Sequence, residues 1–275
     1  MKQSLVLLCL LTAMAHRGYA GSPDNDRKGQ LFIYWGWNRS GYTTSNLRMS
    51  GNDYDFVIHK MMASDRQSPL GLVYLNPGTM TIPQYNYRIG YFIKDTWSLS
   101  IGMDHMKYVM RQDQEARLSG NISHPDAIYQ GQLNGTYKLS PDFLTFEHTD
   151  GLNNLNAEAR HHRTVFRWDI FGAGKSIDLE VMGGAGAGMM IPRTNTQLFM
   201  QERYDRFHVS GFDVHGLAGL RISILDCFFI ASEFKAGYIN MPSIRTTYNA
   251  ADKASQAFGY IQYNILFGAQ LAFRK

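Results

Sequence analysis

Residues 84–103 alternate strictly between apolar and polar side chains, and this pattern limits what the chain can fold into. One row of alternate residues is aromatic or aliphatic: Tyr85, Tyr87, Ile89, Tyr91 and Ile93. The other row is polar apart from Phe92, and the alternation restarts at Trp97 after a short polar stretch at 94–96. A period of two places successive side chains on opposite faces of a β-strand. Two such strands joined by a very short polar turn predict a β-hairpin.

The same two-faced pattern recurs to the end of the chain and predicts a single antiparallel barrel of about twelve strands. The predicted strands are 31–38, 54–59, 70–75, 85–93, 97–110, 128–138, 143–148, 155–168, 177–190, 212–222, 228–238 and 261–273. Ten strands is the alternative if 70–75 is not a strand, whereas twelve keeps both termini in the periplasm.

The lengths of the connections also favour a transmembrane barrel. Short connections are predicted at 93–96, 139–142, 171–175 and 225–226, and longer ones at 39–53, 111–126, 192–207 and 241–256. Transmembrane barrels have short periplasmic turns and longer external loops.

Residues 1–20 have the features of a secretory signal peptide. Lys2 is followed by an apolar run from Leu5 to Met14, and small residues at Gly18 and Ala20 predict cleavage after Ala20. The expected mature protein then has a polar leader at 21–29 and the barrel at 30–275. Cys227 would be its only cysteine, so no internal disulfide is expected.

Charge and hydropathy narrow the class of protein further. The formal charge of +4 falls to +2 once the two cationic side chains of residues 1–20 are removed, and no basic run is present, which argues against nucleic-acid binding. The mean hydropathy of −0.28 is that of a polar protein. A membrane barrel gives such a value because its polar lumen and its lipid-facing surface average out.

Charged side chains gather on one face of the predicted strands, opposite rows of bulky apolar residues. A lipocalin-like barrel or a soluble sandwich also alternates, but its apolar face points inward. Mixed charges on the inner face of a membrane barrel can pair across a filled lumen. The predicted lumen-lining residues are Arg88, Asp104, Asp178, Glu180, Asp213, His215, Arg221, Glu233 and Lys235.

The whole layout resembles that of Gram-negative outer-membrane β-barrel proteins: a signal peptide, alternating strands, turn asymmetry and an aromatic-rich final strand containing Phe273. Proteins of this class often end on an aromatic residue, whereas here Arg274 and Lys275 follow. The resemblance is to the class and not to a single family. It implies an outer-membrane location, outer-membrane lipids and possible outer-membrane proteins as partners, and no cofactor.

Two glycine-rich stretches need an interpretation. The stretch 172–176 is similar to the end of a phosphate-binding loop, but Asp169 stands where that loop needs a glycine and a strand follows where it needs a helix, so no nucleotide site is expected. The stretch 183–188 predicts a strand of small residues that neighbours pack against closely, or a bend in the barrel wall. No metal site is predicted, since His161 and His162 point to opposite faces.

His208 and Ser210 are the candidate catalytic pair. Positions i and i+2 of a strand share a face, so the imidazole could activate the hydroxyl to attack an ester of an outer-leaflet lipid. The pair is similar to the His-x-Ser of outer-membrane lipid A deacylases. Those enzymes continue with Asn where this chain has Gly211, and the nearest later carboxylate, Glu233, is on the lumen row. An interfacial pair near the lipid headgroups is the alternative.

Three functions remain open from the sequence. The first is a non-catalytic integral barrel with a polar lumen filled by side chains, acting as a structural or assembly partner or as a narrow pore. The second is a lipid acyl hydrolase that uses His208 and Ser210. The third is a transporter of a hydrophobic small molecule, which requires an apolar patch in the lumen at Phe92 and Phe229.

Overall fold

The computed structural model describes residues 27–69, 71–74, 83–170, 176–199, 204, 206–225 and 227–271. The predicted signal peptide, the turn at 171–175 and Phe273 lie outside the described residues. No helix in these ranges is long and apolar enough to cross a membrane.

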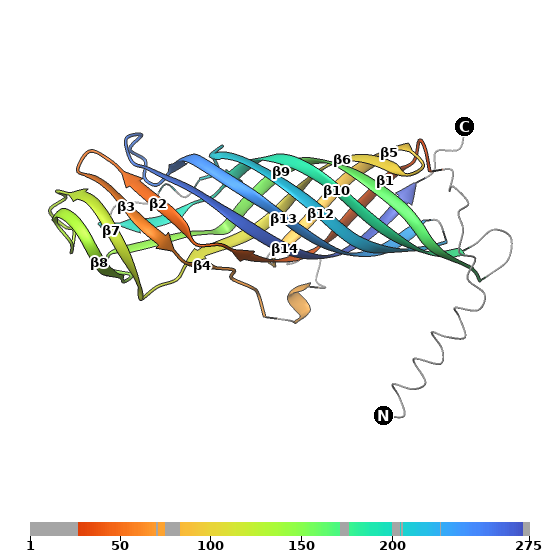
Figure 1. Cartoon of the computed structure of the whole chain (residues 1–275), viewed down its shortest axis with the longest axis horizontal. Helices are drawn as coiled ribbons and strands as arrows, with labels where there is room; N and C mark the ends of the chain where they lie inside the picture. The colour runs from red at the N-terminus through yellow and green to blue at the C-terminus, as the bar shows by residue number, and fades with distance from the viewer. Residues whose placement is uncertain are drawn as a thin grey trace, which may run out of the picture.

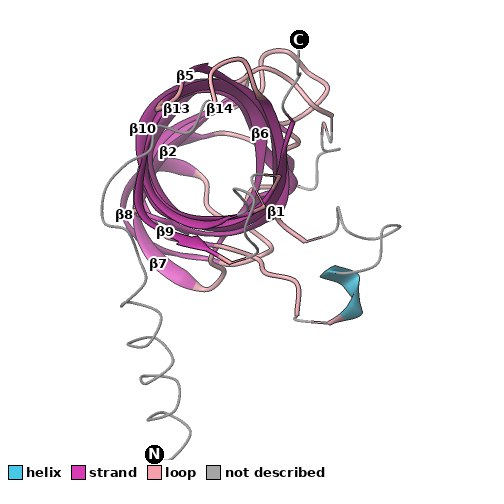
Figure 2. Ribbon diagram, turned by 90° about the vertical axis from the view of Figure 1, so that its right-hand side faces the viewer, coloured by secondary structure: helices cyan, strands magenta, loops and turns pink. Residues whose placement is uncertain are grey.

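Eight antiparallel strands close into a ring (Figures 1 and 2). In spatial order they are β1 (Leu31–Tyr42), β5 (Tyr85–Lys94), β6 (Trp97–Met110), β9 (Leu144–Asp169), β10 (Ser176–Pro192), β12 (Gly211–Ile224), β13 (Phe228–Arg245) and β14 (Lys253–Leu271). The ring closes because β14 pairs with β1 from Leu31 opposite Leu271 to Tyr42 opposite Tyr260.

Four further strands form a sheet that continues from one end of the ring, here called the extension. They are β2 (Ser45–Ser50), β3 (Tyr54–Met61), β7 (Gln114–Ile122) and β8 (Gly131–Leu139), and β2 pairs with residues 253–257 of β14. Two short strands lie off this path: β4 (Ala63–Ser64) pairs with β6, and β11 (Asn195–Leu198) pairs with β9. The opposite end of the ring, with the turn at residues 95–96 and the start of β1, is called the turn end.

The barrel is confirmed, but its ring has eight strands where the sequence predicts about twelve. Two of the predicted strands, 54–59 and 128–138, belong to the extension, and the predicted strands 143–148 and 155–168 are one continuous strand, β9. The described part of 70–75 is a short 3-10 turn at Leu72–Tyr74. Alternation identifies a strand and its faces, but it does not reveal the neighbour with which the strand pairs.

The short turn at 139–142 also differs in position from the prediction. It connects β8 to the beginning of β9, and β9 runs from Leu144 to Asp169 toward the turn end. This turn therefore lies at the extension end, although its length suggested a periplasmic turn. The short connections after β5 and after β12 do lie at the turn end.

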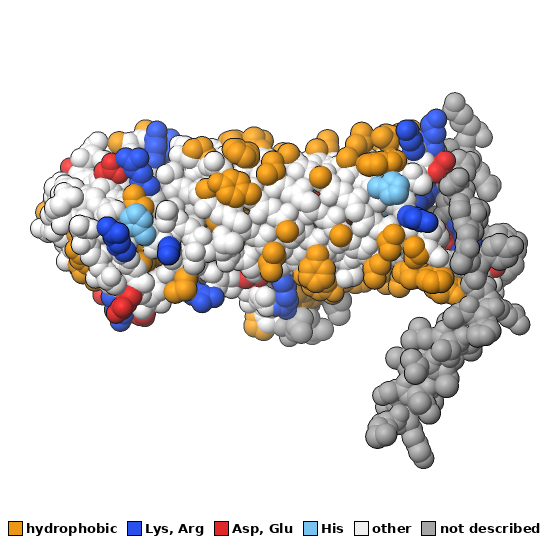
Figure 3. Space-filling model, in the orientation of Figure 1, with side chains coloured by type: hydrophobic (Ala, Val, Ile, Leu, Met, Phe, Trp, Pro, Cys, Tyr) orange, Lys and Arg blue, Asp and Glu red, His pale blue; other side chains and the backbone are white. Residues whose placement is uncertain are grey.

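The outer wall of the ring is covered with apolar side chains. Examples with 44–64% of their surface exposed are Ile89, Leu99, Ile101, Leu220, Ile230, Phe234 and Ile261. Figure 3 shows such side chains spread over the right-hand part of the molecule, with charged side chains mostly at its two ends. A band of this kind flanked by polar ends is typical of strands that face lipid.

The extension has the opposite arrangement. Its interior is an apolar cluster that includes Leu47, Met49, Phe56, Ile58, Leu118, Leu133, Phe143 and Phe146. Its outer surface carries polar residues such as Asn46, Arg48, Glu115, Arg117, Gln132 and Thr136. The extension is therefore packed like a water-soluble domain.

Candidate functional site

The interior of the ring holds the candidate site. All nine residues predicted to line the lumen are buried, with exposures of 6% or less. They come from β5, β6, β10, β12 and β13, because alternate residues of each strand share its inner face.

A buried ion pair crosses the centre of the lumen. Lys235 Nζ on β13 lies 2.5 Å from Asp104 Oδ2 on β6 and 2.8 Å from Glu158 Oε1 on β9. In the eight-membered order of the ring, β6 and β13 lie opposite each other. The two walls of the barrel are thus joined by direct contact between their side chains.

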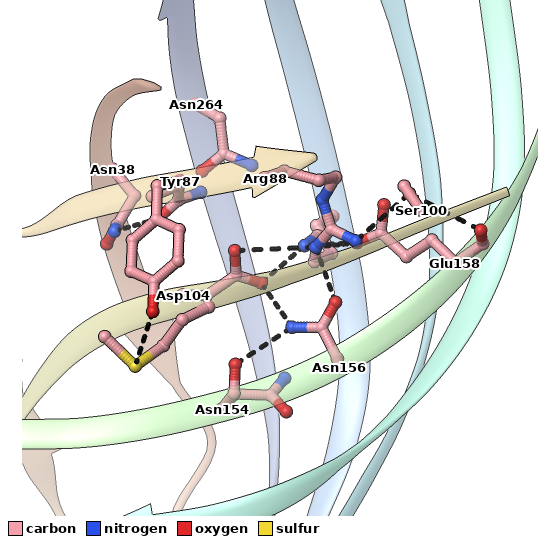
Figure 4. A network of polar contacts seen from close by, with 12 residues as sticks. Asn38, Tyr87, Arg88, Ser100, Asp104, Asn154, Asn156, Glu158 and Asn264 are labelled. Atoms are coloured by element: carbon pink, nitrogen blue, oxygen red, sulfur yellow. Dashed lines mark hydrogen bonds and ion pairs between the residues drawn. The ribbon is translucent and has the colours of Figure 1, made fainter. Parts of the chain in front are cut away.

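Arg88 binds the same carboxylates from the β5 side, as Figure 4 shows. Its guanidinium lies 2.7 Å from Glu158 and 3.9 Å from Asp104, and it donates to Asn156 Oδ1 at 2.5 Å. It also donates to Tyr34 Oη at 2.8 Å. Glu158 therefore accepts from cationic groups on two different strands.

Arg160 extends this network toward β1 and β13. It lies 2.5 Å from Glu158 Oε2 and 2.7 Å from Glu233 Oε2, and it donates to Tyr34 Oη at 2.8 Å. Asn264 donates to the other oxygen of Glu233 at 3.0 Å. We call the connected side chains the central network: Tyr34, Arg88, Asp104, Asn156, Glu158, Arg160, Asp213, His215, Glu233, Lys235 and Asn264.

His215 lies between two carboxylates of the central network. Its Nδ1 is 2.7 Å from Asp213 Oδ1 and its Nε2 is 3.1 Å from Glu158 Oε1. Because an ionised carboxylate only accepts hydrogen bonds, this geometry suits an imidazolium that donates from both nitrogens. Tyr260 and Asn154 also donate to Asp213, each at 2.8 Å.

The glycine-rich part of β10 makes room for these side chains. A Cβ atom added to Gly186 would lie 2.6 Å from His215 Nε2 and 2.6 Å from Glu158 Cγ. Both distances are closer than such atoms can approach without displacement. Close packing of neighbours, as expected for residues 183–188, is what the structure has at this position.

A second polar cluster lies nearer the turn end. Arg27, from the predicted leader, reaches into the barrel and lies 2.7 Å from Glu180 Oε2. Arg167 lies 2.5 Å from Asp178 Oδ2, and the Arg221 guanidinium stacks 3.9 Å from the centre of the Phe229 ring.

Apolar side chains fill the lumen between these two polar clusters. They are Phe32, Phe92, Met182, Phe229, Ala231 and Leu266, together with the ring of Tyr34. Except for Phe92, these residues line, with Arg160, His162 and Arg221, an internal space of about 10 Å³, which has room for one water molecule at most. The apolar lumen patch at Phe92 and Phe229 that a transporter needs is therefore present but tightly packed.

Glu158 and Arg160, two members of the central network, are absent from the predicted lumen set. Their strand looked poorly alternating, because its outward row is made of small or polar residues, namely Ala157, Ala159, His161 and Arg163. The sequence does carry one signal for these residues, since every second position of the strand is polar and together these positions form its inward row: Asn154, Asn156, Glu158, Arg160 and His162.

His208 and Ser210 are close in sequence but do not form a hydrogen bond with each other. His208 Nδ1 lies 3.2 Å from the carbonyl oxygen of Arg206, and its Nε2 accepts from the backbone N–H of Arg245 at 2.9 Å. Partial burial lowers the pKa of the His208 imidazole below its usual value. Ser210 is 3% exposed, and its Oγ has no hydrogen-bond partner among the described residues.

No group of three or more His, Cys, Asp or Glu side chains in the described part of the chain is arranged to hold a metal ion.

No family model matches the sequence, and no curated protein matches it. Solved structures with a similar fold include the outer membrane protein OprG from Pseudomonas aeruginosa (10% identity, 92% of this chain and 100% of that chain, TM-score 0.40). Outer membrane protein AlkL, solved in DMPC lipid bilayers, gives 9% identity over 94% and 97% of the two chains with a TM-score of 0.38. Neisserial surface protein A gives 7% identity over 86% and 98% with a TM-score of 0.31. These likenesses concern the fold alone, and the antiparallel barrel expected from the sequence is seen in the closed ring itself.

Proposed function

We propose that this protein is a non-catalytic, integral barrel of the Gram-negative outer membrane whose lumen is closed by its own side chains. The observation that carries this proposal is the central network, in which Lys235 and Asp104 join opposite walls of the ring at 2.5 Å. Eight-stranded barrels have interiors just wide enough for side chains to fill. If the lumen is closed, the protein acts through its outer surfaces and not through a channel.

The distribution of side chains supports one orientation of the barrel in the membrane, with the turn end in the periplasm. The ring is apolar on the outside, so it belongs in lipid, and its turn end has the short connections expected in the periplasm. The extension then projects outward from the membrane. Its polar outer surface and apolar core suit contact with water.

The extension is the surface through which a structural or assembly role would be performed. β8 pairs with β7 and ends the strand order, so its second edge has no strand partner among the described residues. A free strand edge presents backbone donors and acceptors to another chain. We therefore place the contact with an outer-membrane or extracellular protein at the extension.

Conductance across a planar lipid bilayer tests the closed lumen. We expect the purified, folded protein to insert and to pass no steady current, because the ion pairs of the central network fill the cross-section. Lys235→Met should raise the frequency of current steps, whereas Lys138→Met, at an exposed ion pair of the extension, should not. A stable open conductance at every insertion of the unmodified protein would overturn the proposal.

The hydrolase remains an alternative to be tested by lipid analysis. Mass spectrometry of lipid A and phospholipids would compare cells that express the unmodified protein with cells that express His208→Ala. We expect identical lipids, because both ring nitrogens of His208 are engaged by backbone groups. Loss of an acyl chain only with the unmodified protein would replace our proposal by the hydrolase.

The transporter of a hydrophobic small molecule is supported by one observation, the apolar lumen patch that contains Phe92 and Phe229. Uptake of a radiolabelled hydrocarbon into cells would test it. We expect no difference between cells that carry the protein and cells that lack it, since the space in the patch is about 10 Å³. Uptake that depends on the protein and is lost in Phe229→Trp would favour the transporter.

A further inference from the structure

The outer wall of the ring has an apolar groove of about 690 Å³ that spans β1, β5, β6, β9 and β10. Its floor contains the small side chains Ala157, Ala159 and Ala185. Its rim is built from the exposed side chains of Ile89, Tyr91, Leu99 and Ile101 and the half-buried side chain of Leu31. The groove lies on the lipid-facing side of the barrel, where only lipid or another membrane protein can fill it.

One end of the groove is cationic. The outward row of β9 reads Arg163, His161, Ala159 and Ala157 from the turn end upward, because alternate residues of a strand share a face. His161 and Arg163 are both exposed. The row of charged and then small residues extends for about 20 Å at about 3.3 Å per residue.

Strand register places this cationic end directly next to the groove. Trp97 pairs with His161, and the next outward pair along the same two strands is Leu99 with Ala159, both of which line the groove. The rings of Trp97 and His161 are 5.1 Å apart and meet edge to face. Tryptophan in this position is typical of the boundary between lipid chains and headgroups. Figure 3 shows histidine and cationic side chains next to hydrophobic ones near the right-hand end of the barrel.

Arg163 has no counter-ion in the described part of the protein. Its neighbours across β10 are Val181 and, one strand further, Leu220, which are both apolar and exposed. An arginine on the lipid face of a barrel is unfavourable unless it reaches an anion or water. The planar guanidinium is suited to phosphate, because it can donate two parallel hydrogen bonds to it.

We propose that this wall of the barrel holds one glycerophospholipid, with its phosphate at Arg163 and His161 and one acyl chain in the groove over Ala159 and Ala157. The occupant is a phospholipid because the turn end faces the periplasm under the proposed function, and the lipid contacts there are those of the inner leaflet. Trp97 lies beside the headgroup. This inference rests on the barrel being embedded in the outer membrane, but it does not require a closed lumen.

Native mass spectrometry of the folded protein tests the site, with phosphatidylglycerol in mild detergent as the probe. We expect the unmodified protein to retain one phosphatidylglycerol molecule. Arg163→Ala should weaken its binding about tenfold, as expected for loss of one charge-assisted contact. Ala159→Leu should weaken it by a similar factor, because it fills the floor of the groove without touching Arg163.

Two variants serve as matched controls. Arg117→Ala removes an exposed arginine of the extension, and Ala218→Leu enlarges an exposed small residue of β12 that does not line the groove. Neither should change the retained lipid. Circular dichroism and heat-modifiable gel migration would show that every variant is folded.

Equal retention by Arg163→Ala and the unmodified protein would overturn the inference, as would retention of no lipid or of lipopolysaccharide in place of phosphatidylglycerol. Failure of the protein to insert into lipid vesicles at all would remove the proposed function as well. Normal insertion without a bound phospholipid would remove only the site.

Discussion

The ring and the extension are built from the same alternating strands but face opposite ways. In the ring, apolar residues point outward and a charged network fills the interior; in the extension, apolar residues form the interior and charged residues point outward. One strand of the ring, β9, also contributes side chains to the apolar cluster of the extension. β9 buries Leu144 and Phe146 in the extension and then Glu158 and Arg160 in the ring. The surrounding solvent therefore decides which row of a strand is buried, while the period of two remains the same.

β14 shows the same reversal along its length. Its inward row is mostly apolar where it adjoins the extension, with Ala254, Phe258 and Tyr260 around the buried Gln256, and it is polar at Gln262 and Asn264 in the ring. In water the favourable term is the burial of apolar surface. In lipid the outer surface is already apolar, so the interior can be polar provided that its groups are paired. Four predictions test this contrast between the ring and the extension, in order of decreasing expected effect.

Removing the carboxylate of Glu158 should be the most destabilising change. Glu158→Ala leaves the three cations Arg88, Arg160 and Lys235 with only two carboxylates, Asp104 and Glu233. One buried positive charge is then uncompensated, which typically costs about 3–5 kcal/mol. The free energy of unfolding would be measured by urea titration in lipid vesicles. Glu115→Ala, at an exposed position of the extension, should stay within about 0.5 kcal/mol. Equal losses for the two variants would contradict the difference between the regions.

Removing apolar volume from the interior of the extension should destabilise the extension by a similar amount and should leave the ring folded. Leu118 is fully buried, and Leu118→Ala should cost about 2–5 kcal/mol through lost contacts and a cavity. Limited proteolysis should then cut the extension while the strands of the ring resist. Thr136→Ala, on the outer face of β8, is the control. Loss of the ring together with the extension would show that the two regions unfold as one unit.

Placing the same charge on the outer face of each region compares their surroundings directly. Ile101 is 60% exposed on the ring, and Ile101→Arg should cost about 2–4 kcal/mol if lipid surrounds it near the bilayer midplane. Thr136→Arg on the extension should have almost no effect, because water surrounds it. Unfolding free energies in vesicles would decide between these expectations. A negligible cost for Ile101→Arg would mean that this wall does not face lipid.

The smallest effect should come from His208, which lies just before β12. Its pKa is lowered by burial, so the folded protein keeps it neutral while the unfolded chain takes up a proton near the ordinary pKa of about 6.5. Stability should therefore be unaffected above pH 7 and fall as the pH drops below about 6.5. The loss of stability would be measured by hydrogen exchange of the backbone N–H of Arg245, which donates to His208. The pH dependence should vanish in His208→Gln, and its persistence there would assign it to another group.

The sequence predicts which face of most strands points into the lumen, but it does not identify every residue of the central network. Nine lumen residues could be predicted because each has at least one bulky apolar neighbour in the chain. Glu158 and Arg160 could not be found in this way, since small and polar residues make up the outward row of their strand. The sequence predicts loops where β2 and β7 lie, for a related reason. Their apolar rows, Leu47 with Met49 and Ala116 with Leu118, are short, and the rows opposite are strongly polar.

Alternation along the chain is enough to predict a two-faced antiparallel barrel, with an apolar face and a charged face on most strands. Alternation is a local property: each strand carries it whatever its neighbours are. Long-range strand pairing sets the remaining features: eight strands close the ring, four others form the extension, and Lys235 contacts Asp104 across the lumen. These features depend on pairing between residues far apart in the chain, and a period of two is compatible with many such pairings.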